Sequence, residues 1–159
     1  MSHTVHVGLP GGRAYDVHVG RGLLADVADL AGLTGDHRVL VVTQAPVATH
    51  HLDRLLDGLR AAGVATEVAE IADGESAKDL ATYADLLARC AEVPLRRSDA
   101  VVALGGGVVG DLAGFVAATY NRGIVVVQVP TTLLAQVDAA IGGKTGLNLP
   151  GGKNLVGAF

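Results

Sequence analysis

Segments with the two-residue period of a strand alternate with segments of helical period along most of this chain, and this alternation constrains its fold more than any other feature. The clearest strand is the apolar run at 100–104, which we expect to be buried on both faces because it contains no polar side chain. Strands that alternate with helices form a parallel sheet covered by helices. The sequence therefore predicts an α/β fold, a Rossmann-like parallel sheet with helices on both faces.

The same periods predict the other elements. Two short alternating runs, 4–9 and 14–19, flank Pro10-Gly11-Gly12 and predict an N-terminal β-hairpin. Ser76 is a candidate N-cap for the helix that Pro94 ends, and the chain after Gly142 is expected to be glycine-rich and irregular. Further strands are expected at 38–43, 64–71 and 124–129, and helices at about 23–30, 46–62, 76–93, 108–120 and 132–141.

Composition excludes several classes of function. The 159 residues are half apolar, which suits one domain over 1–159. The net charge of -4, with no basic cluster, disfavours nucleic-acid binding, and no uncharged apolar run reaches the ~18 residues that cross a bilayer. Cys90 is the only cysteine, and the N-terminus lacks the layout of a secretion signal, so we expect a cytoplasmic protein.

A glycine motif follows the strand at 100–104. Gly105, Gly107 and Gly110 satisfy G-x-G-x-x-G at the start of a predicted helix, where backbone N–H groups and the helix dipole can meet a pyrophosphate. No Asp or Glu ends the next strand, so a ribose would have to be held elsewhere. A nucleotide site is favoured, and the alternative is a turn that only permits close packing of helix and strand.

Three charged residues lie near the predicted carboxyl edge of the sheet. Asp111 falls in the first turn of the helix at 108–120, where compensation of the helix dipole is the simpler interpretation. Glu75 and Lys78 lie at another turn between strand and helix, from which they can reach ribose hydroxyls. The alternative for this second pair is a local i, i+3 ion pair.

A second polar group lies farther along the chain. Asp138 interrupts an apolar helical segment, so its carboxylate must be paired or must face a polar cleft. Lys144 and Lys153, expected in flexible loops, are candidates to neutralise it or, with Asn154, to bind an anionic substrate. The chain holds nine arginines but only three lysines, which favours functional lysines over solvated ones.

Other polar residues have simpler interpretations. Thr131 and Thr132 follow a proline at a helix start, so capping explains at least one of them. The histidines all lie in the first third of the chain without metal-ligand spacing, and we predict no metal ligand among these residues. Cys90 falls inside a predicted helix, and no serine stands in a G-x-S-x-G elbow, so neither thiol nor serine catalysis is expected.

The chain resembles the 3-dehydroquinate synthase family over essentially its whole length. The resemblance is carried by GGGVVGDLAGFVAATYNRG at 105–123, VPTTLLAQVDAAIGGKTGLN at 129–148 and GKNLVGAF at 152–159, with weaker support from GRGLL at 20–24 and DGESAK at 73–78. It implies a Rossmann-like N-terminal domain that binds NAD, followed by an all-helical domain whose Glu and two His bind zinc or cobalt. It also implies a homodimer that converts a sugar phosphate, 3-deoxy-D-arabino-heptulosonate 7-phosphate, to 3-dehydroquinate.

The resemblance also implies roles for individual residues. It assigns Gly105, Gly106, Gly107 and Asp111 to the pyrophosphate, Glu75 and Lys78 to the ribose, and Thr131 and Thr132 to the nucleotide. It makes Asp138, Lys144, Lys153 and Asn154 active-site groups, and it directs Arg122 to the substrate phosphate of the neighbouring subunit. The chain departs from the family near Thr43-Gln44, where members often carry an acidic ribose contact, so that contact is in question.

Three alternatives stay open. Other sugar-phosphate cyclases, namely 2-deoxy-scyllo-inosose and epi-valiolone synthases, look different at 110–111, 142–145 and 152–154. Metal-dependent alcohol or glycerol dehydrogenases share the glycine loop but lack the two lysine loops. Because Phe159 falls where the family passes into its zinc domain, the third alternative is a non-catalytic nucleotide-binding fragment. We expect the isolated chain to fold, bind NAD weakly, expose apolar surface at its cleft and fail to turn over.

Overall fold

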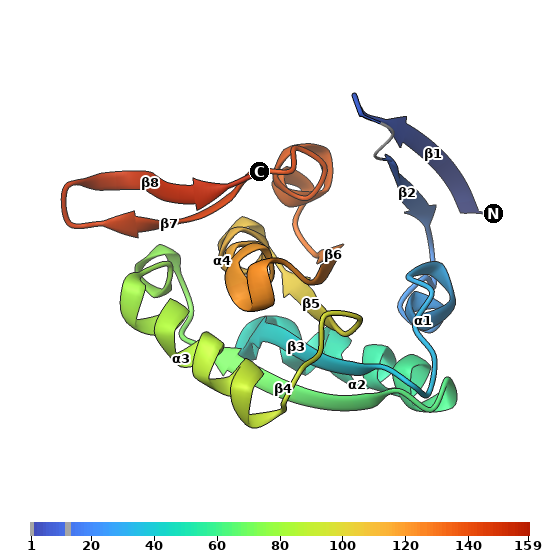
Figure 1. Cartoon of the computed structure of the whole chain (residues 1–159). Coiled ribbons are helices and arrows are strands. Elements are labelled where there is room, and N and C mark those ends of the chain that lie inside the picture. Colours follow the sequence, from blue (N-terminus) through green and yellow to red (C-terminus); the bar gives the residue numbers. More distant parts are fainter. Residues whose placement is uncertain (1, 12–13) are drawn as a thin grey trace.

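An open parallel sheet of four strands lies at the centre of the computed structural model, which describes residues 2–11 and 14–159 (Figure 1). The strand order is β4-β3-β5-β6, and β5 is buried along its whole length. The predicted α/β, Rossmann-like fold is confirmed. The strands are β3 (Arg38–Gln44), β4 (Ala65–Ile71), β5 (Ala100–Gly105) and β6 (Val125–Pro130).

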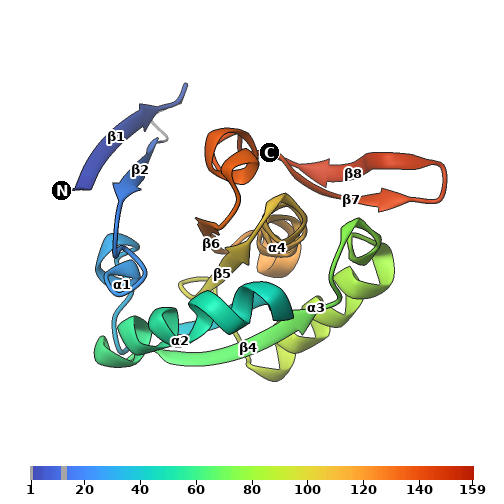
Figure 2. The same ribbon diagram turned by 180° about the vertical axis from the view of Figure 1, so that it is seen from behind.

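Helices cover both faces of this sheet (Figure 2). On β3, Val41 is buried with Leu55 on the face of α1 and α2, whereas its neighbour Leu40 is buried with Leu112 on the face of α3 and α4. Successive strand side chains point to opposite faces, so one strand serves both cores. The helices are α1 (Val27–Leu30), α2 (Ala45–Ala61), α3 (Leu80–Glu92) and α4 (Gly107–Thr119).

The predicted N-terminal hairpin is confirmed and stands away from the sheet (Figure 1). β1 (Ser2–Gly8) pairs with β2 (Ala14–Gly20) in antiparallel register. Gly12 of the predicted turn lies outside the described residues. The hydroxyl of Tyr15 donates to the carbonyl oxygen of Ile141 at 2.7 Å, which joins the hairpin to the segment after β6.

The prediction of an irregular chain after Gly142 is wrong. β7 (Thr145–Leu149) and β8 (Gly152–Ala158) form an antiparallel hairpin, and β7 packs on α4. A Cβ atom at Gly157 would lie 2.0 Å from the carbonyl oxygen of Thr145. The glycines that suggested a loop therefore let two strands approach closely, a requirement that no local pattern of side chains reveals.

Two predicted helix starts also differ. Ser76 lies inside a short 3-10 helix, η1 (Glu75–Ala77), and Asp79 instead caps α3 by accepting from the backbone N–H of Thr82 at 2.8 Å. The segment predicted as a helix at 132–141 is a π-helical turn, η3 (Ala135–Ala139), after a short helical start. In both segments the backbone forms a short 3-10 or π-helical turn over three to five residues in place of a regular α-helix.

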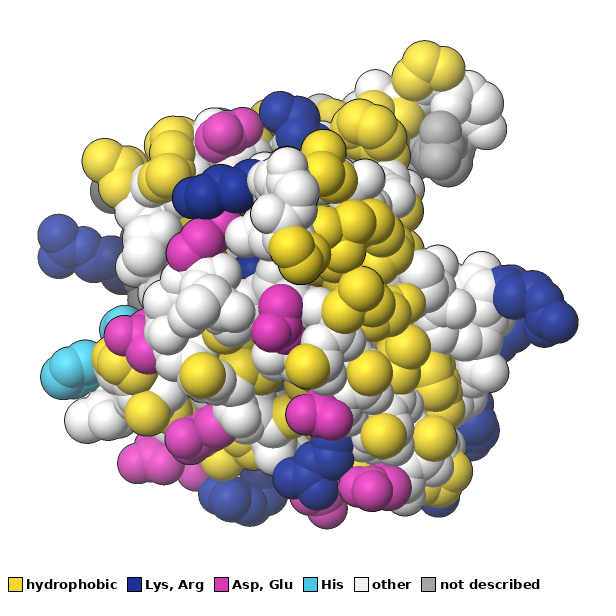
Figure 3. Space-filling view, turned by 90° about the vertical axis from the view of Figure 1, so that its left-hand side faces the viewer, with side chains coloured by type: hydrophobic (Ala, Val, Ile, Leu, Met, Phe, Trp, Pro, Cys, Tyr) yellow, Lys and Arg dark blue, Asp and Glu magenta, His cyan; other side chains and the backbone are white. Residues whose placement is uncertain are grey.

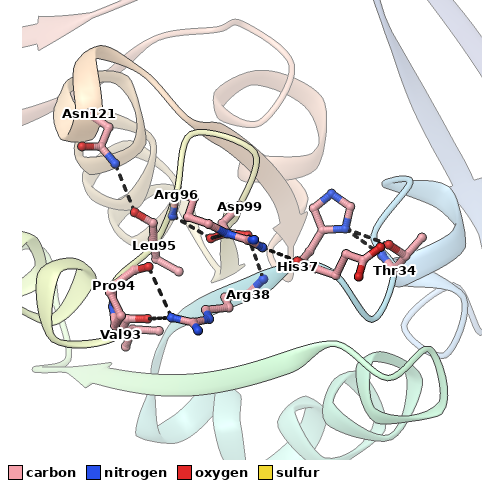
Figure 4. A network of polar contacts seen from close by, with 10 residues as sticks. Thr34, His37, Arg38, Val93, Pro94, Leu95, Arg96, Asp99 and Asn121 are labelled. Atoms are coloured by element: carbon pink, nitrogen blue, oxygen red, sulfur yellow. Dashed lines mark hydrogen bonds and ion pairs between the residues drawn. The ribbon is translucent and has the colours of Figure 1, made fainter.

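At the opposite, amino edge of the sheet, Asp99 is fully buried and organises the loop before β5 (Figure 4). Its carboxylate accepts from the backbone N–H groups of Arg38 at 3.0 Å and Arg96 at 2.6 Å, and the guanidinium of Arg96 lies 3.1 Å away. Burial by itself raises the pKa of Asp99, but these hydrogen bonds and the positive charge of Arg96 outweigh it and lower the pKa to about 2.

No helix among residues 2–11 and 14–159 is long and apolar enough to span a membrane. Figure 3 shows the face that carries the β7–β8 turn and α3, where acidic and basic side chains are interspersed beside an apolar area. A single-sign electrostatic surface is therefore absent from this face.

Candidate functional site

The carboxyl edge of the sheet carries the glycine loop, as predicted. β5 ends at Gly105, Gly106 is the N-cap of α4 without a side-chain cap, and α4 begins at Gly107. The backbone N–H of Thr131 donates to the carbonyl oxygen of Gly105 at 2.9 Å, which holds the loop against the end of β6. Within the part of the chain that the structure describes, no side chain caps the first N–H groups of α4, so this helix start can receive an anion.

Packing explains part of the glycine motif but not all of it. A Cβ at Gly105 would lie 2.5 Å from the Val109 side chain, and one at Gly106 would lie 3.2 Å from Thr132. At Gly107 the nearest atom would be the Cβ of Ala139, at an ordinary contact distance of 3.8 Å. Close packing of helix and strand therefore accounts for Gly105, whereas the bare backbone at Gly107 is free to meet a ligand.

Lys78 is the most deeply buried lysine, with 3% of its surface exposed. Its ammonium group donates to the carboxylate of Asp111 on α4 and to the side-chain oxygen of Asn154 on β8. A buried charge needs such partners because desolvation alone costs several kcal/mol. The alternative of a local ion pair with Glu75 is not what the structure contains, since Lys78 pairs with Asp111 instead.

Asp111 lies beyond the first turn of α4, so its predicted role as a simple dipole-compensating residue is wrong. Its carboxylate is the counter-ion of Lys78 and has only 20% of its side chain exposed. The ion pair connects the helix after the glycine loop with the turn after β4. This contact between residues 33 positions apart was not predictable from the local sequence.

Glu75 is half-exposed and lies near Lys153, whose Nζ atom is 3.7 Å from its Oε1 atom. The side chain of Asn148 donates to the same oxygen at 2.9 Å. This hydrogen bond lowers the pKa of Glu75, with smaller opposing and supporting contributions from burial and from the charges of Lys153 and Lys78. Lys153 is on β8, so its predicted place in a flexible loop is wrong.

Asn148 is the site residue that sequence reasoning missed. It lies on β7 between two leucines, and a polar side chain interrupting an apolar strand was the available signal. Its side-chain oxygen accepts from the backbone N–H of Asn154 at 2.9 Å, and its own backbone N–H donates to the carbonyl oxygen of Lys78 at 2.8 Å.

A hollow of about 510 Å³, a size within the range of small-molecule sites, brings together three of the four predicted substrate groups, Asp138, Lys144 and Asn154. Lys153 is not among its lining residues and lies near Glu75 instead. Asp138 is exposed and faces this hollow, so it meets the expectation of a polar cleft and requires no buried counter-ion. Lys144 lies in the loop before β7 and lines the same hollow. The polar or charged lining residues are Asp111, Asp138, Lys144, Thr145 and Asn154.

Thr131 and Thr132 lie at the end of β6, next to the glycine loop. The hydroxyl of Thr132 accepts from the backbone N–H of Ala135 at 3.2 Å, which confirms that capping explains one of the pair. The backbone of Thr131 is used to hold Gly105. The side chain of Thr131 stays available at the carboxyl edge.

Two residues are not brought into this site. Arg122 is exposed with a left-handed φ of 64° and precedes β6, so it lies at the amino edge of the parallel sheet. Gln44 is 7% exposed, and its amide nitrogen donates to the carbonyl oxygen of Ala72 at 2.8 Å. The amide of Gln44 is thus engaged inside the protein instead of pointing toward a ligand.

An apolar surface flanks the hollow, in agreement with the expectation for the cleft side. Leu155 and Phe159, which line the hollow, have 62% and 98% of their surfaces exposed. Among the residues that the structure describes, no group of three or more His, Cys, Asp and Glu side chains could hold a metal ion.

Comparison with known proteins agrees with this geometry. Residues 68–159 match the family described as 3-dehydroquinate synthase N-terminal. The chain is 55% identical over 161 residues to a 3-dehydroquinate synthase of Caulobacter vibrioides and 51% identical over 157 residues to one of Pelotomaculum thermopropionicum. These matches cover 100% and 98% of this chain but only 43% and 42% of the relatives, so the chain spans less than half their length.

Solved structures of related cyclases have the same fold. A 2-deoxy-scyllo-inosose synthase in complex with carbaglucose-6-phosphate, NAD+ and Co2+ superposes with a TM-score of 0.89 at 28% identity, over 99% of this chain and 43% of that one. A 2-epi-5-epi-valiolone synthase from Streptomyces hygroscopicus with NAD+ and Zn2+ gives 0.83 at 34% identity, over 96% and 42%. A glycerol dehydrogenase from Schizosaccharomyces pombe, at 20% identity and a TM-score of 0.69, shares the fold alone.

Proposed function

The chain belongs to the 3-dehydroquinate synthase family, and we propose that it is the NAD-binding N-terminal domain of an enzyme that makes 3-dehydroquinate. The substrate would be 3-deoxy-D-arabino-heptulosonate 7-phosphate, and phosphate would be released. The observation that carries the proposal is the convergence of Asp111, Asp138, Lys144 and Asn154 on one hollow beside a bare helix start.

The residues at the carboxyl edge fit a dinucleotide. Gly107 leaves backbone exposed at the start of α4, whose unpaired N–H groups suit a pyrophosphate. Glu75 can accept hydrogen bonds from ribose hydroxyls, because it is half-exposed and its lowered pKa keeps it ionised at neutral pH. Thr131 and Thr132 would contact the nucleotide from the end of β6. When bound, NAD would take up a hydride from the substrate and return it.

The other side of the hollow fits an anionic sugar. Lys144 and Asp138 both line this side. The exposed ammonium group of Lys144 can attract a phosphate or carboxylate group of the sugar, and the carboxylate of Asp138 can accept a hydrogen bond from a sugar hydroxyl. Asn154 presents an amide at the same hollow. The described residues do not fit zinc, which the resemblance implies for the whole enzyme, and we propose that its ligands lie outside this chain.

The nucleotide site can be tested by substituting Gly107 with Ala. The added methyl group meets only Ala139, at 3.8 Å, so the free energy of unfolding should stay within about 0.5 kcal/mol of the original. It covers the backbone that would approach the pyrophosphate, so NAD binding measured by calorimetry should weaken by about tenfold or more. Gly151→Ala, at an open position in the β7–β8 turn, is the matched control and should bind NAD normally.

Amide NMR spectra of the 159-residue chain give the location of binding. NAD should shift the resonances of Gly106, Gly107 and Thr132 and leave the amino edge around Asp99 unchanged. A chain that binds no NAD, or binds it equally well with Ala at 107, would contradict the proposed nucleotide site.

The substrate is tested with the protein isolated from its native cells. We expect NAD-dependent release of phosphate from 3-deoxy-D-arabino-heptulosonate 7-phosphate together with 3-dehydroquinate. Identity of 55% to a 3-dehydroquinate synthase, against 28% and 34% to the two other cyclases, supports this substrate. Formation of 2-deoxy-scyllo-inosose or 2-epi-5-epi-valiolone from a different sugar phosphate would assign the protein to those cyclases instead.

We further propose a cytoplasmic homodimer. Arg122 lies at the edge of the sheet opposite to the hollow of its own chain, which supports a role toward the substrate phosphate bound by a neighbouring subunit. The single, fully buried Cys90 suits a reducing compartment.

A further inference from the structure

Asn148 makes hydrogen bonds to residues on both sides of the site. It lies on β7, where the register with β8 shifts between Leu147 and Leu149. Such an irregularity changes the direction of a side chain relative to a regular strand. Its amide nitrogen donates to Glu75 at 2.9 Å and its amide oxygen accepts from the backbone N–H of Asn154 at 2.9 Å.

The bond to Asn154 supports an unusual backbone. Asn154 has a left-handed φ of 55°, which non-glycine residues rarely adopt. The backbone N–H of Asn154 donates to the side-chain oxygen of Asn148, and this hydrogen bond stabilises the left-handed conformation of Asn154 on β8. The side-chain oxygen of Asn154 then accepts from the ammonium group of Lys78, which also pairs with Asp111.

These contacts form one continuous connection. Glu75 and the backbone of Lys78 meet Asn148 on one side, and Asn154 meets it on the other. The side chain of Asn148 does not line the hollow, unlike Asn154 and Asp111. Its polar atoms face other protein groups and not the space where a substrate would lie.

We propose that Asn148 is a positioning residue that fixes Glu75 and Asn154 relative to each other and so couples the nucleotide side of the site to the substrate side. The inference rests on the proposed function for the identity of the two ligands. The contacts that carry it exist without any ligand, so part of its test is independent of that function.

The ligand-free test compares the original chain with Asn148→Ala by NMR. Loss of one hydrogen bond should speed hydrogen exchange at the Asn154 amide by about fivefold or more relative to the rest of β8. The pKa of the Glu75 carboxyl should rise toward its ordinary value, because its principal hydrogen bond is removed. The carboxyl resonance of Asp111 should also move, since Lys78 loses a fixed partner in Asn154. The control Gly151→Ala, at an open position in the turn of the same hairpin, should leave all three unchanged.

A second pair of variants separates positioning from general stability. Asn148→Asp keeps an acceptor for the Asn154 N–H but places a carboxylate against Glu75, so it should disturb Glu75 and Lys78 without freeing Asn154. Adding Glu75→Gln to this variant places an amide donor at position 75 opposite the new carboxylate at position 148. The hydrogen bond between the two positions is then restored with donor and acceptor exchanged. The Asp111 resonance should then return toward its original position in the double variant. If the Asp111 resonance is displaced equally in the single and double variants, the exchanged hydrogen bond does not restore the site, and the proposed coupling is wrong.

Binding completes the test. In the original chain, NAD and the heptulosonate phosphate should each strengthen the other's binding, about fivefold or more, and in Asn148→Ala this mutual effect should fall to within about twofold of none. If neither ligand binds the original chain, the proposed function fails while the ligand-free result still decides the positioning role. If Asp111, Glu75 and Asn154 are all unaffected by Asn148→Ala, the positioning role itself is wrong.

Discussion

Replacement of Asp99 by Asn should destabilise the fold strongly at neutral pH and less in acid. The Asp99 carboxylate is fully buried and accepts hydrogen bonds from the backbone of Arg38 and from the backbone and guanidinium of Arg96. An Asn side chain offers only one acceptor oxygen. Its NH₂ group would therefore face at least one buried N–H donor, leaving that donor without a partner.

The expected magnitude has two parts. The pKa of Asp99 is lowered from 3.8 to about 2, and each pKa unit corresponds to about 1.4 kcal/mol, so the ionised carboxylate contributes about 2 kcal/mol to stability at neutral pH. An unsatisfied buried donor adds about 1 to 2 kcal/mol. We therefore expect the free energy of unfolding to fall by about 3 to 4 kcal/mol in Asp99→Asn.

The pH dependence follows from the direction of the shift. Because the folded pKa is below the unfolded one, the contribution of ionised Asp99 is complete above about pH 4 and is lost as the pH falls through about 2. About half of it should be gone near pH 3. The difference between the original chain and Asp99→Asn should shrink accordingly, whereas an exposed control, Asp85→Asn, should differ little at any pH.

Urea denaturation from neutral pH down to about pH 3 measures these differences. If acid unfolds the chain first, titration of the Asp99 carboxyl resonance measures the same pKa in the folded state. A loss below about 0.5 kcal/mol at neutral pH, or a difference that does not change with pH, would refute the reasoning.

Two further predictions concern the hairpin and the thiol. Gly157→Ala should lower the free energy of unfolding by about 2 to 3 kcal/mol in urea denaturation, because its methyl group would lie 2.0 Å from the carbonyl oxygen of Thr145, whereas Gly151→Ala should change it by less than about 0.5 kcal/mol. An equal effect of the two would mean that the strands separate easily. Burial raises the pKa of the Cys90 thiol to about 11, so iodoacetamide should alkylate it at least about a hundredfold more slowly in the folded chain than in urea, and rates within tenfold of each other would contradict the buried site.

The order and type of the main elements could be predicted because burial imposes periodicity on neighbouring residues. β5 is a continuous apolar run since both of its faces are covered, and α2 repeats leucines on one face since only that face is buried. The glycine loop after β5 was also predictable, since G-x-G-x-x-G requires a strand before it and a helix after it. These are local consequences of a parallel α/β sheet.

Contacts between distant segments could not be predicted in this way. Lys78 was a candidate from its scarcity, but its partners Asp111 and Asn154 come from α4 and β8. The β7–β8 hairpin was mistaken for a loop because its glycines serve strand contact and not flexibility. In each case the deciding quantity is a distance across the fold, which no spacing along the chain encodes.

Sequence alone was thus sufficient for the parallel sheet, the glycine loop before α4 and the polar groups that the proposed function uses. Residue type and period carry this information because each depends on the immediate neighbourhood of the chain. Only the tertiary structure decided that Lys78 is buried between Asp111 and Asn154, that Asn148 joins Asn154 to Glu75, and that Arg122 lies at the opposite edge. The physical reason is that a buried charge or amide must find its partners wherever the fold brings them.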